Sequence, residues 1–187
     1  MTQERQQFTA FSRVLHWTMA AMILTMLGVG TAMVASLSDY HVLVSIHRPL
    51  GVAILLLVAV RFVNRLLHTP PPFPDTMPRM ERRVAAASEI TLYVLMFALP
   101  LVGWAMLSAA RYPIVLYGPI RLPYILPHNL QVYAILRKTH TVLAYLFFFV
   151  FIAHLGAVLF HTLIVRDGIL NRMLPWRAGP KVSAAND

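Results

Sequence analysis

The stretch between Lys138 and Arg166 constrains this chain most, because residues 139–165 contain no Asp, Glu, Lys or Arg. An apolar run of that length crosses the hydrocarbon layer of a bilayer as one tilted helix. The run also contains His140, His154 and His161. Ionisable side chains at membrane depth are costly, so these histidines are candidates for a functional site.

Three further apolar runs predict three more spanning helices, which gives expected spans at about residues 14–36, 42–67, 90–110 and 139–165. The composition agrees, with 58% hydrophobic and 12% charged residues, whereas a soluble domain carries about twice that charged fraction. We therefore predict an all-α, integral membrane four-helix bundle that forms one domain over residues 1–187. The proline-rich segment from His68 to Arg83 is expected to be an extended aqueous loop, and the connection from Arg111 to Lys138 is expected to lie on the membrane surface.

The basic residues predict the orientation. Most of the Lys and Arg residues lie in the loops and tails on the side of the two termini. The positive-inside rule therefore places both termini in the cytoplasm. The opposite side carries a smaller group: Arg48, Arg111, Arg121, Arg137 and Lys138. Asp39 is the one acid on that outer side, so the outer side is net positive. This positive charge either contacts lipid headgroups or attracts an anion. We expect no nucleic-acid partner for this charge.

The histidines pair across the predicted helices. His140 and His154 lie ~21 Å apart along a helix and within ~40° of the same direction, so both face one side at different depths. Topology places His16 at the depth of His154, near the inner surface, and His47 at the depth of His140, near the outer surface. Two imidazoles from facing helices, with a flat macrocycle between them, form a bis-His b-type haem site. The absence of Cys excludes covalent attachment through C-x-x-C-H, so the two haems would be held without a covalent link.

The neighbours of these histidines fit the same hypothesis. Small residues follow them at helical spacing, namely Ala20, Gly51, Ala144 and Ala157. Cations that could contact propionates or another anion are Arg13, Arg48, Arg137 and Lys138.

Other uses of these histidines carry less weight. A single intramembrane His is more often a hydrogen-bonding helix contact, but four that pair by depth are not explained that way. A zinc site needs three or four ligands around one metal, which the distance between His140 and His154 prevents. A proton relay usually includes acids at membrane depth, and none is present there. His161 is either a quinone contact or an ordinary interfacial residue.

The chain resembles the prokaryotic cytochrome b561 family of small di-haem membrane cytochromes from about Phe11 to Trp176. The resemblance is carried by RVLHW around His16, by SIHRPLGVAILLLVAVRFVNRLL around His47, by LYVLMFALPLVGW in the third span, and by RKTH followed thirteen residues later by His154. The closing segment RDGILNRMLPW is also similar to the family. The resemblance implies that His16, His47, His140 and His154 are the axial ligands of haem iron, and that the protein is a multi-pass protein of the bacterial inner membrane.

What the resemblance implies about function is electron transfer across that membrane. One type of member is a superoxide oxidase, which passes electrons from periplasmic superoxide through two haems to ubiquinone. The alternative is a non-catalytic cytochrome b carrier or subunit that serves a periplasmic redox protein. Where members often have a His before the third span, this chain has Glu89, so His161 and Glu89 are the candidates for an inner quinone or proton site. The sequence assigns no catalytic residue.

Overall fold

A computed structural model describes residues 7–74 and 77–174, and four long helices dominate this part of the chain. They are α1 (Ala10–Ala35), α2 (Tyr40–Leu67), α3 (Arg79–Ala109) and α4 (Leu130–Phe160). All four are long and apolar enough to cross a membrane, α4 together with the turn that follows it. The fold is therefore a membrane four-helix bundle.

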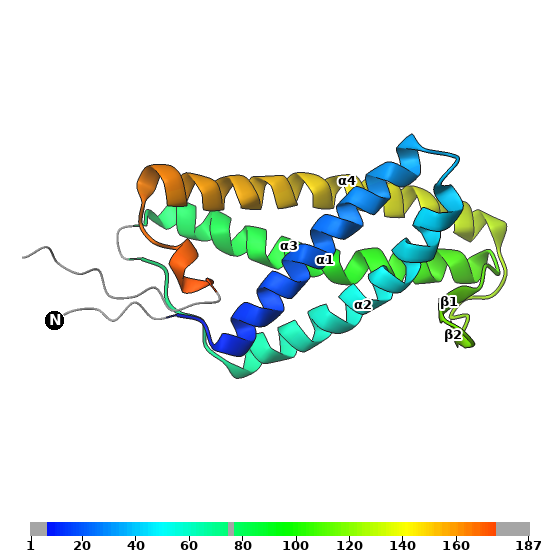
Figure 1. Ribbon diagram of the computed structural model, residues 1–187, viewed down its shortest axis with the longest axis horizontal. Coiled ribbons are helices and arrows are strands. Elements are labelled where there is room, and N and C mark those ends of the chain that lie inside the picture. The colour runs from blue at the N-terminus through cyan, green and yellow to red at the C-terminus, as the bar shows by residue number, and fades with distance from the viewer. Residues whose placement is uncertain (1–6, 75–76, 175–187) are drawn as a thin grey trace, which may run out of the picture.

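Shorter elements close the two ends of the bundle (Figure 1). The antiparallel strands β1 (Ile114–Tyr117) and β2 (Ile120–Leu122) form a hairpin at one end, which we call the hairpin end. After α4 come a π-helical turn, η1 (His161–Val165), and a 3-10 turn, η2 (Leu170–Arg172). These lie at the opposite end with the start of α1, and we call this end the terminal end.

The helices do not pack evenly against one another. Close backbone contacts join α1 to α2, α2 to α3, and α3 to α4, and the last of these pairs runs side by side in Figure 1. Within the described residues, neither α1 nor α2 makes more than slight backbone contact with α4. Within the described residues, α4 therefore packs closely against α3 and remains separated from α1 and α2.

All four helices begin earlier than hydropathy predicts, and α3 and α4 do so by about ten residues. The helix α3 starts at Arg79, directly after Pro78, so the end of the predicted aqueous loop is helical. The helix α4 starts at Leu130, because the side chain of Asn129 accepts hydrogen bonds from the backbone N–H groups of Gln131 and Val132. Hydropathy marks the part of a helix that meets lipid, whereas caps decide how far it continues into water.

The tail after α4 folds back over the start of α1. The Phe8 N–H donates to the Arg172 carbonyl at 3.2 Å, and the Gln7 amide donates to the Asn171 carbonyl at 2.9 Å. The Trp17 indole N–H donates to the Met173 carbonyl at 2.7 Å, so this tryptophan ties two distant segments together. Trp176, which ends the segment similar to the family, lies outside the described residues.

The apolar core lies at mid-depth and draws on all four helices. Its buried members are Met19, Ile23, Val58, Leu95, Met96 and Phe147. Phe147 lies midway between His140 and His154 on α4, so the core separates the two depths at which the histidines occur. Many large apolar side chains elsewhere are exposed, as expected for surfaces that contact lipid.

We predict that Leu95→Ala destabilises the bundle by about 2 kcal/mol, at the low end of the range for core leucines. Lipid is as apolar as the core, so the loss comes mainly from the cavity left behind. Leu95 is 3% exposed, whereas Leu101 on the same helix is 44% exposed. Denaturant unfolding in detergent should therefore show a clear loss for Leu95→Ala and little change for Leu101→Ala. Equal losses would contradict the assigned core.

Candidate functional site

The structure brings His47 of α2 and His140 of α4 together at the hairpin end. Their ring centres are 6.2 Å apart, and the ring planes meet at 70°. At the terminal end, His16 of α1 and His154 of α4 lie close enough for an electrostatic interaction. We call these the hairpin-end pair and the terminal-end pair. Each pair links α4 to α1 or α2, whose backbones make at most slight contact with that of α4 in the described residues.

Each pair supplies two nitrogen ligands and no more. Among the residues that the structure describes, no group of three or more His, Asp or Glu side chains could hold a metal ion. A metal held by two imidazoles therefore needs its remaining ligands from elsewhere, and a porphyrin supplies four.

The hairpin-end pair is closely surrounded by protein. The Nδ1 atoms of His47 and His140 are buried without a well-formed hydrogen bond in the described chain, and the backbone of Leu99 on α3 lies close to the His140 ring. Gly103 of α3 lies against His140, since a Cβ atom at this glycine would be 3.3 Å from Cε1 of that ring. Gly51, the small residue expected beside His47, faces Met26, whose Cε would be 3.6 Å from an added Cβ. Nothing in the residue pattern indicates that Gly103 makes room for a histidine of another helix.

A chamber of about 790 Å³ lies at the hairpin end, and neither His47 nor His140 is among its lining residues. Its walls include Arg48 of α2, Arg137 of α4 and His41, and apolar side chains of β1 close one side. Arg48 donates from Nη1 to the Pro113 carbonyl at 3.2 Å. Of the predicted anion contacts on this side, Arg48 and Arg137 line the chamber, while Lys138 is exposed on α4.

At the terminal-end pair, Arg61 of α2 reaches His16. Its Nη2 lies 3.2 Å from Nδ1 of His16, and its Nη1 donates to the Ser12 carbonyl at 3.3 Å. Arg13, a predicted propionate contact, is 9% exposed, donates to the Gln7 amide oxygen at 2.6 Å, and has a buried Nε without a partner in the described chain.

Glu89 lines a smaller cavity at the terminal end, with a volume of about 70 Å³. Both of its carboxylate oxygens accept hydrogen bonds from Arg65, at 2.9 and 3.1 Å. Arg61 and Asn64 line the same cavity. A space of this size holds a few water molecules.

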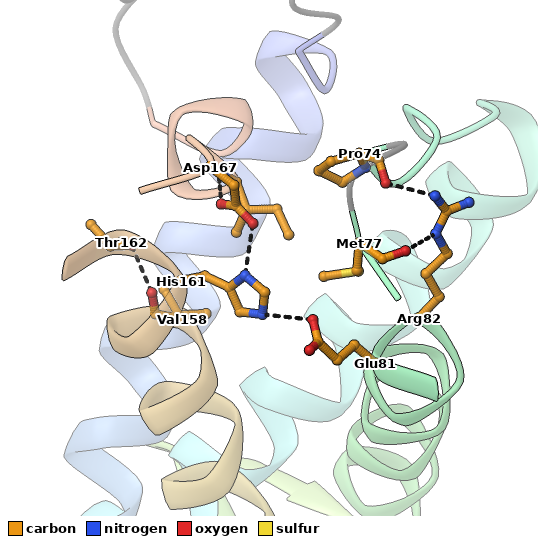
Figure 2. A network of polar contacts seen from close by, with 9 residues as sticks. Pro74, Met77, Glu81, Arg82, Val158, His161, Thr162 and Asp167 are labelled. Carbon is orange, nitrogen blue, oxygen red and sulfur yellow. Dashed lines mark hydrogen bonds and ion pairs between the residues drawn. The ribbon is translucent and has the colours of Figure 1, made fainter. Parts of the chain in front are cut away.

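His161 lies apart from that cavity, at the start of η1. Figure 2 shows its ring between two carboxylates, with Asp167 on one side and Glu81 of α3 on the other. The distance from Nδ1 to Asp167 Oδ2 is 2.7 Å, and the distance from Nε2 to Glu81 Oε2 is 3.9 Å. Asp167 also accepts from the Ile169 N–H at 3.0 Å. The two residues predicted for an inner quinone or proton site therefore have separate surroundings.

Comparison with known proteins decides what kind of protein carries these pairs. Residues 7–176 match the model of the family described as prokaryotic cytochrome b561. The chain belongs to the prokaryotic cytochrome b561 family. Membership implies b-type haem and electron transport, and it makes the protein a multi-pass protein of the bacterial inner membrane.

Individual relatives of this cytochrome b561 cover most of both chains. Cytochrome b561 homolog 2 of Escherichia coli (strain K12) is 28% identical over 177 residues, which is 92% of this chain and 94% of the relative. Cytochrome b561 homolog 1 of the same organism is 29% identical over 140 residues, or 75% and 79%. A protein named probable superoxide oxidase CybB, from Yersinia pestis, is 31% identical over 134 residues, or 72% and 76%.

Proposed function

We propose that this protein is a di-haem cytochrome that carries single electrons across the inner membrane, with superoxide:ubiquinone oxidoreductase activity. The observation that carries the proposal is the separation of α4 from the helices that bear its histidine partners. A flat group between two facing imidazoles needs such a separation. Two pairs at opposite ends of the bundle suit two haems, one near each membrane surface.

The hairpin-end pair fits an iron ligated from both sides. Two imidazoles bound on opposite sides of one metal, at roughly 2 Å per bond, have ring centres about 6 Å apart. The 6.2 Å between the ring centres of His47 and His140 agrees with this arrangement. Gly103 supports it, because a larger residue there would displace the His140 ring.

The terminal-end pair fits for a different reason. Arg61 lies beside the His16 ring, with Nη2 3.2 Å from Nδ1, so a cation adjoins this pair. Ala20 and Ala157, one turn beyond His16 and His154, leave room for a macrocycle against the helices. The buried and partly unpartnered Arg13 suits a propionate.

In this proposal the four histidines hold the cofactors and exclude other ligands. A b haem, when bound, accepts and releases one electron at its iron. If an imidazole held the iron from each side, a substrate would find no open site on the metal and would react at the cofactor's edge. The apolar core around Phe147 keeps water out of the region between the two pairs.

Superoxide is proposed as the electron donor because the hairpin end is cationic. Arg48, Arg137 and His41 line a chamber at the hairpin end. Within the described chain neither arginine has a carboxylate within ion-pair distance, so their charge is available to attract a small anion and speed its encounter. The relative named a probable superoxide oxidase adds support to this choice.

The proposed orientation places the terminal end in the cytoplasm and the hairpin end in the periplasm. Basic residues are concentrated near the termini and the loop after α2, as the positive-inside rule requires. Superoxide and any periplasmic redox protein would then meet the hairpin end.

Ubiquinone is proposed as the acceptor, and its reduction requires protons. The terminal-end cavity of about 70 Å³ is too small for a quinone ring but can hold water beside Glu89. His161, held between Asp167 and Glu81, is a second candidate for proton delivery.

The test is the reaction itself. Purified protein, first shown by its reduced-minus-oxidised spectrum to contain two b haems per chain, is mixed with superoxide and a soluble ubiquinone. We expect quinone reduction and superoxide loss faster than spontaneous dismutation. Two haems without any such reaction would instead support a non-catalytic electron carrier or subunit for a periplasmic redox protein.

We predict that His140→Ala and His154→Ala each remove one haem, and that the two losses differ. His140→Ala should leave the terminal-end haem, and His154→Ala should leave the hairpin-end haem. Haem quantitation and redox titration of each variant check this. His47→Ala should give the same redox titration as His140→Ala, because both variants should lose the hairpin-end haem. If the titration of His47→Ala instead matched that of His154→Ala, the assigned pairing would be wrong.

We predict that Gly103→Val lowers the haem content by about one haem per chain. The first added carbon would lie 3.3 Å from Cε1 of His140, and a ring fixed by a metal cannot move away. Gly30→Val is the matched control, because nothing lies within 4 Å of a Cβ atom at Gly30. The same haem content in both variants would argue against His140 as a ligand.

A further inference from the structure

We propose that the chamber at the hairpin end binds the headgroup of an anionic phospholipid, with Arg48 and Arg137 holding its phosphate. The recognised chemistry is a phosphodiester without a neighbouring cation, as in phosphatidylglycerol. The inference requires neither haem nor superoxide, because neither histidine pair lines the chamber. It therefore gives a ligand to a part of the bundle that the proposed electron path does not use for its cofactors.

Two helices each bring a tyrosine and an arginine to the chamber. Tyr40, Val44 and Arg48 follow one another at intervals of four residues on α2, which makes one row of side chains along that helix. Tyr133 and Arg137 repeat the same interval on α4. Since all of these residues line one space, two guanidinium groups reach it from different helices.

The charge of these two arginines is uncompensated within the described residues. The ion pairs of this part of the chain all involve residues at the terminal end, and no Asp or Glu lines the chamber. Asp39 at the hairpin end accepts from the Ser36 hydroxyl at 2.8 Å. Arg48 donates one N–H to the Pro113 carbonyl at 3.2 Å and keeps its other donors. Guanidinium groups of this kind suit a phosphate, which each can bind through two N–H groups.

Both arginines reach the depth at which lipid phosphates occur. Arg137 lies directly before Lys138 and the charge-free residues 139–165, so it marks the point where α4 enters the hydrocarbon layer. Arg48 starts deeper in its span, but its guanidinium extends to Pro113 in the connection between α3 and α4. The two charges can therefore meet one headgroup at the membrane surface.

The other walls of the chamber favour a lipid over a small inorganic anion. Its volume of about 790 Å³ greatly exceeds the size of a phosphate ion. The rings of Tyr112 and Tyr133 pack edge to face with centres 6.2 Å apart, and tyrosine is typical of the lipid headgroup level. Apolar side chains suited to the glycerol and the first acyl methylenes come from α2, α3 and β1: Val44, Met106, Leu107, Val115 and Leu116.

The charge of the chamber also predicts which headgroups it rejects. Phosphatidylcholine carries an ammonium group beside its phosphate, and this group would meet the field of Arg48 and Arg137. Repulsion of that cation favours phosphatidylglycerol, which has the phosphate alone. A bound headgroup would use the same arginines that are proposed to attract superoxide, so lipid and superoxide are expected to compete at this end.

The experiment is native mass spectrometry of the full-length protein in a neutral detergent, titrated with phosphatidylglycerol or with phosphatidylcholine. We expect one phosphatidylglycerol per chain to bind about tenfold more tightly than phosphatidylcholine. The double variant Arg48→Gln/Arg137→Gln should lose this preference. Arg121→Gln is the matched control, because Arg121 is an exposed arginine of β2 outside the chamber lining, and it should bind both lipids as the parent does.

Equal binding of the two lipids by the parent, or a preference that persists in the double variant, would overturn the inference. Displacement of the lipid by an equal concentration of inorganic phosphate would also overturn it, since the site would then recognise any phosphate. If the double variant does not fold, Arg137→Gln alone decides, because this side chain is exposed and its loss should reduce the preference about threefold. An unchanged preference in that variant would count against the proposal.

These outcomes are separate from those of the superoxide test. A protein that reduces quinone with superoxide but shows no lipid preference retains the proposed function and loses this inference. A protein without b haem that binds phosphatidylglycerol selectively through the two arginines retains this inference and loses the proposed function.

Discussion

The separation of α4 from α1 and α2 is the constraint on which the rest of this bundle depends. Helices in a membrane approach closely when nothing intervenes, and α3 does so with α4. On the opposite side, histidines occupy the two levels where α4 faces α1 and α2, and the side chain of Phe147 contributes to the core between those levels. The result is a bundle with a packed centre and one histidine pair toward each end. In the proposed arrangement, cofactors supply the contacts that the helices do not make with each other.

The two ends differ in what surrounds their histidines. At the hairpin end the walls are cationic, the chamber is wide, and β1 forms part of its lining. At the terminal end the tail covers the start of α1, the cavity is narrow, and Arg65 and Glu89 neutralise each other. The first set of features suits access by a charged molecule from water. The second suits a closed site that exchanges little more than water and protons with its surroundings.

Sequence reasoning identified the spans and the four histidines because both follow from the cost of placing charge in lipid. Charge-free runs mark the helices, and their order along the chain fixes the depth of His16, His47, His140 and His154. The early starts of α3 and α4 depend instead on local caps, and the hairpin of β1 and β2 depends on pairing within a connection that hydropathy describes only as mixed. Arg61 and Gly103 escaped notice for a third reason. An arginine near a helix end and a glycine in a membrane helix are both common, and only the fold shows that each touches a histidine of another helix.

The place of α4 in the chain has a consequence for how the protein is made. Both histidine pairs require this helix, and it is the last of the four to be synthesised and inserted. Until then, His16 and His47 sit in the bilayer without partners, and neither proposed haem can gain its second ligand. In the proposed arrangement, both haems are therefore bound only after α4 is in place. A truncated product that lacks α4 would reach the membrane as three helices and remain colourless.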